Sequence, residues 1–80
     1  MQAIGMGRST HFGRLLKQYR SEQLLTQEEL ADRAGISPRS IRAAEQGESR
    51  PQKGTAQRLA TALGLEQEAL TEFLAAAFPT

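Results

Sequence analysis

The sequence contains no cysteine and only one histidine, His11. Because cysteine is absent, the chain can form neither a disulfide framework nor a thiolate metal site. A single histidine cannot make a zinc site by itself. We therefore expect a protein without a bound metal or any other cofactor.

Long apolar segments are also missing. No apolar run approaches the roughly 20 residues that span a membrane, and the first residues lack the apolar core of a signal peptide. These absences favour a soluble, cytoplasmic protein that makes no membrane contact.

Residue sets that carry catalysis are absent as well. The sequence has no Ser/His/Asp set, no glycine loop of the kind that cradles phosphate, and no cluster of metal ligands. Glu28 and Glu29 are neighbours on a predicted helix, so their carboxylates diverge and cannot act as a catalytic pair. We expect a protein that is not an enzyme.

The charge is distributed unevenly along a chain of 80 residues, which is long enough for one domain. The net charge is only +1. Residues 1–20 carry +4 and residues 37–58 carry +3, whereas residues 21–36 and 59–80 carry −3 each. A chain polarised in this way suits a partner that presents charge on one side.

Apolar residues recur at helical spacing over residues 10–78, and no alternating β-branched pattern interrupts them. We therefore predict an all-α domain, preceded by a disordered arm over residues 1–9. The first predicted helix runs from Thr10 to about Gln23. Its apolar face comprises Phe12, Leu15, Leu16 and Tyr19.

Thr26 and Glu29 have the spacing of a capping box. In this motif the threonine hydroxyl accepts from the glutamate backbone N–H, while the carboxylate accepts from the backbone N–H of the threonine. Apolar positions continue as far as Gly35, a residue that suits the left-handed end of a helix. We predict a short helix over about residues 26–34.

A second helix start follows almost at once. Ser37 is a favourable N-cap and Pro38 a favourable first helical residue, which predicts a helix over about residues 38–46. Two short helices joined by a three-residue turn cross steeply, as in a helix-turn-helix. Arg39 and Arg42 then lie on the outer face of the second helix, which could enter the major groove of DNA.

Two further helices complete a predicted five-helix domain. They run from about Thr55 to Leu63 and from about Gln67 to Phe78. The face that carries Phe73 and Phe78 either closes the core or forms a dimer seam.

The segment LTQEELADRAGISPRSIRAAEQG resembles the helix-turn-helix of the phage repressor/Cro-like family, also called the xenobiotic-response-element family. FGRLLKQYR, the GESRP loop and RLATALGL extend the resemblance over roughly Phe12 to Leu70. More narrowly, FGRLLKQYR, AGISPRSI and FLAAA are similar to the N-terminal domains of actinobacterial multidomain transcriptional regulators. The resemblance implies sequence-specific binding of double-stranded DNA in transcriptional regulation, repressor-like, as a homodimer on DNA.

The resemblance also implies roles for individual residues of the second helix. The positions that read bases in the family are occupied here by Pro38, Arg39 and Ala43, and we expect Ser40 and Arg42 to help in reading bases. Arg39 is the strongest candidate, because arginine can bond to guanine O6 and N7 together. Ala43 could offer only apolar contact, and Pro38 shapes the helix start.

Three further positions match phosphate-contacting residues of the family: Gln27, Gln46 and Arg50. For Gln27, a backbone N–H at a helix N-terminus would aid the contact with an anion.

The family's pattern also predicts a structural ion pair between Arg20 and Glu45. Two residues depart from that pattern. Leu24 stands where glycine is usual after the first helix, which predicts a different helix end or strain of about 1 kcal/mol. Lys53 stands where a serine or threonine N-cap is common, which leaves the start of the fourth helix open.

An alternative function remains at this point. The same fold could serve as an antitoxin-like or other partner-binding module with little affinity for DNA. That alternative predicts no salt-dependent DNA binding and loss of a partner when Leu70 or Phe73 is changed.

Overall fold

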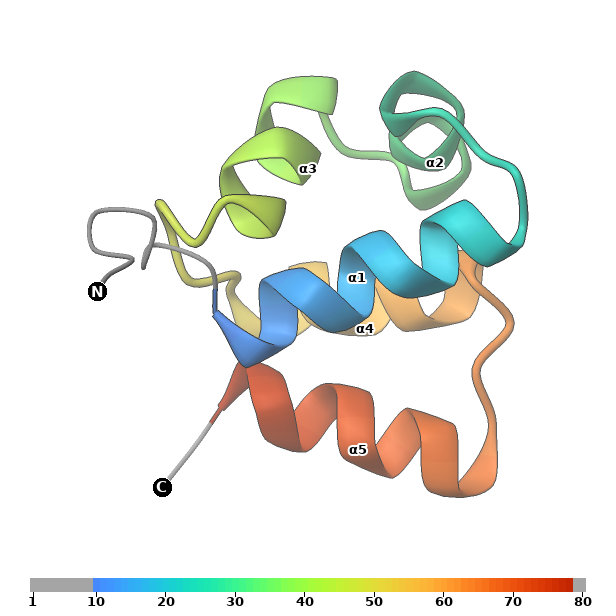
Figure 1. Cartoon of the computed structure of the whole chain (residues 1–80), viewed down its shortest axis with the longest axis vertical. Helices are drawn as coiled ribbons and strands as arrows, with labels where there is room; N and C mark the ends of the chain where they lie inside the picture. The colour runs from blue at the N-terminus through green and yellow to red at the C-terminus, as the bar shows by residue number, and fades with distance from the viewer. Residues whose placement is uncertain (1–9, 79–80) are drawn as a thin grey trace, which may run out of the picture.

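The computed structural model describes residues 10–78, which form five helices and no strand (Figure 1). The all-α, five-helix prediction is confirmed. The arm predicted for residues 1–9 lies outside the described residues. The helices are α1 (His11–Glu22), α2 (Gln27–Ala34), α3 (Pro38–Glu45), α4 (Lys53–Ala62) and α5 (Gln67–Ala77).

The other four helices lie on two sides of α1. Figure 1 shows α2 and α3 on one side of α1, and α5 on the opposite side. α1 contacts both α3 and α5, while α4 contacts α2 and α5 and so links the two sides. The pair formed by α2 and α3 is therefore carried on one side of the domain.

The core takes one large, fully buried side chain from each helix. These five residues are Leu16, Leu30, Ile41, Leu59 and Phe73. The ring of Phe73 lies 4.8 Å from that of Phe12 and 6.2 Å from that of Tyr19, measured between centroids. Phe73 thus closes the core against α1 and cannot be part of an exposed dimer seam, whereas Phe78 is only half-buried.

The predicted helix caps are present at α2 and α3. The backbone N–H of Glu29 donates to Thr26 Oγ1 at 3.0 Å, and that of Thr26 donates to Glu29 Oε1 at 2.8 Å. Ser37 Oγ accepts from the Ser40 backbone N–H at 3.1 Å. Gly35 ends α2 with a φ of 73°, in the left-handed region that glycine favours.

Most predicted helix boundaries differ from the observed ones by one or two residues. α4 begins at Lys53, not Thr55. The extended Gln52 is its N-cap, and the side chain of Gln52 makes no capping hydrogen bond. α3 ends at Glu45, so that Gln46 is its C-cap and not its last helical residue.

Leu24, where a different helix end or strain was predicted, has the left-handed backbone conformation that is unfavourable for a residue with a Cβ. This residue has a φ of 59°, and its side chain is 89% exposed. Its backbone N–H donates to Ser21 O at 3.0 Å, which ends α1 in a tight turn. A second non-glycine residue with positive φ, Gln67 at 54°, was not predicted.

Candidate nucleic-acid interface

The two sides of α3 have opposite character. Ile41 and Ala44 are buried and pack this helix onto the domain. On the outer side, Pro38, Arg39, Ser40 and Arg42 are exposed, and Ala43 is half-buried. The structure therefore brings all five residues predicted to read bases to one helix, with both arginines in solvent.

The first turn of α3 is held by its own hydroxyl groups. Ser37 Oγ lies 3.0 Å from Ser40 Oγ in addition to accepting from the Ser40 backbone N–H. The Ser40 hydroxyl is thus already engaged by its neighbour. Arg39 is exposed and makes no such side-chain contact within the described residues.

The turn between α2 and α3 is supported from α4. Arg58 Nη1 donates to the carbonyl oxygen of Gly35 at 3.4 Å. The family resemblance did not suggest this role for Arg58. The contact ties the end of α2 to α4 beside the start of α3.

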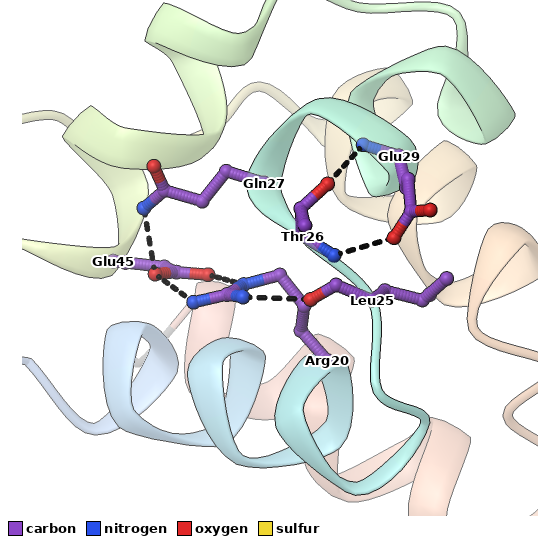
Figure 2. Close-up of polar contacts among 6 residues, drawn as sticks. All are labelled: Arg20, Leu25, Thr26, Gln27, Glu29 and Glu45. Carbon is purple, nitrogen blue, oxygen red and sulfur yellow. Dashed lines mark hydrogen bonds and ion pairs between the residues drawn. The ribbon is translucent and has the colours of Figure 1, made fainter.

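The three residues predicted to contact phosphate occupy two places. Gln46 and Arg50 are exposed at the end of α3 and in the loop that follows it. Gln27, the first residue of α2, is half-buried, and its Nε2 donates to Glu45 Oε1 at 3.0 Å (Figure 2). Its side chain thus contacts the end of α3.

The predicted pair of Arg20 and Glu45 is present and is joined by further hydrogen bonds. Arg20 Nε donates to Glu45 Oε2 at 2.6 Å, and Nη2 donates to Glu45 Oε1 at 3.1 Å. Arg20 Nη1 donates to the carbonyl oxygen of Leu25 at 2.8 Å. The hydrogen bond from Arg20 to Glu45 raises the pKa of Arg20, and burial opposes this shift.

This network is largely removed from water. The Arg20 and Glu45 side chains are only 14% and 5% exposed. Figure 2 shows the guanidinium of α1 between the Glu45 carboxylate of α3 and the chain that leads into α2. The network therefore fixes α3 relative to α1 and α2.

α2 and α3 are thus two short, packed helices that are joined by a glycine turn and capped by Thr26 and Ser37. In comparisons with known proteins, residues 11–74 match the model of a family described as the helix-turn-helix domain. The chain belongs to this helix-turn-helix family.

Two relatives of this helix-turn-helix domain are regulators by description. The domain is 46% identical over 52 residues to an HTH-type transcriptional regulator of Methanothermobacter thermautotrophicus, a match that spans 65% of this chain and 75% of that protein. Its fold is similar to the crystal structure of the restriction-modification controller protein C.AhdI from Aeromonas hydrophila. That match has a TM-score of 0.69 and 32% identity, and covers 74% of this chain and 89% of the other. These relatives support the expectation that the domain is not an enzyme.

One residue that positions α3 was missed by sequence reasoning. A Cβ added to Gly13 of the helix-turn-helix domain would lie 2.6 Å from Glu45 O and 2.7 Å from Ala44 O. Both atoms belong to the backbone, so α1 and the last turn of α3 approach too closely for any larger residue. The signal was a glycine on the buried face of an otherwise regular helical pattern.

Other kinds of site have little support in the described part of this helix-turn-helix domain. Residues 10–78 contain no group of three His, Cys, Asp or Glu side chains placed to hold a metal ion. No helix in this part is long and apolar enough to cross a membrane. A hollow of about 530 Å³ lies between α1, α5 and the loop after α3, with Phe12 and Ala75–Ala77 in its apolar wall. The exposed side of α3 remains the candidate site.

Proposed function

We propose that this helix-turn-helix domain binds specific sequences of double-stranded DNA in transcriptional regulation, with α3 in the major groove. The observation that carries the proposal is the exposed basic side of α3 above a buried apolar side. The major groove is wide enough to admit an α-helix, and each base pair presents a distinct pattern of donors and acceptors there.

Base reading in this proposal depends chiefly on Arg39. It lies in the first turn of α3, is exposed, and carries a planar fork of donors that matches guanine O6 and N7. Arg42 is the second reader one turn further along, and Ala43 contributes an apolar contact. Ser40 contributes less than Arg39, because its hydroxyl is held by Ser37. Pro38 fixes the start of the helix.

Phosphate contacts supply most of the affinity in this proposal. Arg50 and Gln46 meet the DNA backbone beyond the end of α3. At the start of α2, the capping box uses the backbone N–H groups of Thr26 and Glu29. Those of Gln27 and Glu28 have no partner within the helix and are suited to a phosphate oxygen.

We further propose that the domain acts as a homodimer on DNA, in the manner of phage repressor/Cro-like proteins. Two copies of α3 about 34 Å apart would read the halves of a pseudo-palindrome. The narrower resemblance suggests a repressor-like N-terminal domain of an actinobacterial multidomain regulator. A cytoplasmic location is part of the same proposal, in keeping with the resemblance to actinobacterial regulators.

Selection of bound sites from random duplexes tests the proposal. We expect one enriched sequence with two related halves, bound with an affinity that falls steeply as salt rises. No enriched sequence and no salt-dependent binding would contradict the proposal and favour a partner-binding module.

A further inference from the structure

Glu45 is a buried carboxylate whose oxygens are both occupied. Its side chain is 5% exposed, and it accepts two hydrogen bonds from Arg20 and one from Gln27. A buried carboxylate depends on such donors, because it has lost the water that would otherwise hydrate it. The Gln27 amide therefore completes the environment of Glu45.

The same hydrogen bond connects two places that matter for the proposed function. Gln27 is the first residue of α2, where phosphate is proposed to bind, and Glu45 is the last residue of α3. The bond from Gln27 Nε2 to Glu45 Oε1 measures 3.0 Å and spans 18 residues of sequence (Figure 2). It therefore sets the start of α2 relative to the end of α3.

The bond to Glu45 restricts what the Gln27 side chain can do elsewhere. The amide nitrogen of glutamine carries two N–H groups, and here one of them donates to Glu45 Oε1, so only the second could reach a phosphate while that bond is kept. Turning the whole amide toward DNA would leave Glu45 Oε1 with a single donor, on a carboxylate whose side chain is only 5% exposed. The backbone N–H of Gln27 is free of this conflict.

We infer that the side chain of Gln27 is a positioning residue for α3 and acts through its hydrogen bond to Glu45. This inference rests on the proposed function, because α3 is positioned for reading bases. The phosphate at the start of α2 is then met by backbone N–H groups, while the Gln27 amide holds α3 at the angle that its base contacts require.

The two roles of Gln27 predict different losses on mutation. A lost phosphate contact weakens binding to all sequences alike, so the ratio of specific to nonspecific affinity stays constant. A lost positioning contact lowers the affinity for the selected site and leaves nonspecific affinity unchanged. The ratio of the two affinities, measured at one salt concentration, therefore separates the roles.

We would compare Gln27→Met with Gln46→Met at the end of α3, where the glutamine is exposed. Methionine keeps the length of the side chain and the backbone N–H but removes the donor. For Gln27→Met, we expect the specificity ratio to fall about tenfold, the loss that corresponds to one hydrogen bond to a charged group. For Gln46→Met, we expect an unchanged ratio with weaker binding to both DNAs.

A replacement that keeps a donor at residue 27 should restore the specificity ratio. In Gln27→Lys the ammonium can still donate to Glu45, so we expect a wild-type specificity ratio even though the added charge raises both affinities. The same variant serves if Gln27→Met is unfolded at the assay temperature. A rescued ratio supports positioning, whereas a ratio as low as that of Gln27→Met would overturn it.

A measurement without DNA tests the contact itself. The Arg20 Nε–H signal in NMR spectra should shift and exchange faster with water in Gln27→Met, but not in Gln46→Met. An unchanged Arg20 signal, or an unchanged specificity ratio in Gln27→Met, would overturn the inference alone. Failure of the wild-type domain to select any sequence would overturn the proposed function itself.

Discussion

Leu24 combines two unfavourable features in one residue. Its φ of 59° brings its Cβ too close to the backbone, and its side chain is 89% exposed and gains no apolar burial. The tight turn between α1 and α2 requires this conformation, since Leu25 N–H donates back to Arg20 O at 3.1 Å. The strain is therefore a property of the position, and the side chain does nothing to offset it.

Leu24→Gly should stabilise the domain by about 1 kcal/mol, because glycine adopts positive φ without a steric penalty. Thermal unfolding should show a midpoint higher by about 4–8 °C. Leu24→Ala is the control: it removes the exposed side chain but keeps Cβ, so its midpoint should stay near that of the wild type. Equal midpoints for the glycine and alanine variants would show that strain is not the cause.

At the scale of elements, α1 and α3 meet backbone to backbone at Gly13. A Cβ at this position would lie within 2.7 Å of two carbonyl oxygens, and neither can move without moving the last turn of α3. Gly13→Ala should therefore destabilise the domain by about 2 kcal/mol. Denaturant unfolding measures this change.

Gly54 provides a matched control for that variant. It also lies in a helix, near the start of α4, but a Cβ added there meets no atom within 4 Å. Gly54→Ala should stabilise the domain by up to about 1 kcal/mol through helix propensity alone. Similar losses from both glycines would contradict the close contact between α1 and α3.

The ion pair of Arg20 and Glu45 should show strong coupling. Glu45→Ala should cost about 3 kcal/mol, because it leaves a largely buried guanidinium without its carboxylate. The double variant Arg20→Met with Glu45→Leu should cost less than Glu45→Ala alone. Losses that simply add in a double-mutant cycle would show that the two side chains are not energetically coupled.

The stabilisation that the ion pair of Arg20 and Glu45 provides should not change near neutral pH through titration of Arg20. The hydrogen bond to Glu45 raises the pKa of Arg20 above its ordinary value, so the stabilisation is complete below the ordinary pKa and is lost only as the pH rises through the higher pKa of the folded state.

The local sequence predicts where a helix begins when a side chain caps it, and fails to do so when no side chain does. Thr26 and Ser37 act on backbone groups three residues away, so their pattern alone predicted where α2 and α3 begin. Lys53 begins α4 without a side-chain cap and leaves no such local signal, which explains the prediction at Thr55.

Contacts between helices were predicted less well. The pair of Arg20 and Glu45 came from family resemblance, not from periodicity. The approach of Gly13 to the backbone of α3 and the bond from Gln27 to Glu45 join residues far apart in sequence. Such contacts depend on how the helices pack, which helical spacing alone does not report.

At the scale of the whole molecule, charge and architecture agree. The basic residues Arg39, Arg42 and Arg50 are exposed on α3 and the loop after it. The acidic side chains of α5, Glu68 and Glu72, are also exposed, and Figure 1 shows α5 across α1 from α3. A duplex bound at α3 would therefore stay away from the acidic helix α5. The charge of successive sequence segments indicated a polarised chain, but it did not show where in the fold each segment lies.

The most direct test of base reading by α3 compares Arg39→Ala with Arg50→Ala on the selected duplex and on random DNA over a series of salt concentrations. Arg39→Ala should weaken the selected duplex by about 1–3 kcal/mol and change binding to random DNA little. Arg50→Ala should weaken both and reduce the slope of log affinity against log salt by about 0.9. Equal losses on both DNAs from Arg39→Ala would contradict the claim that α3 reads sequence.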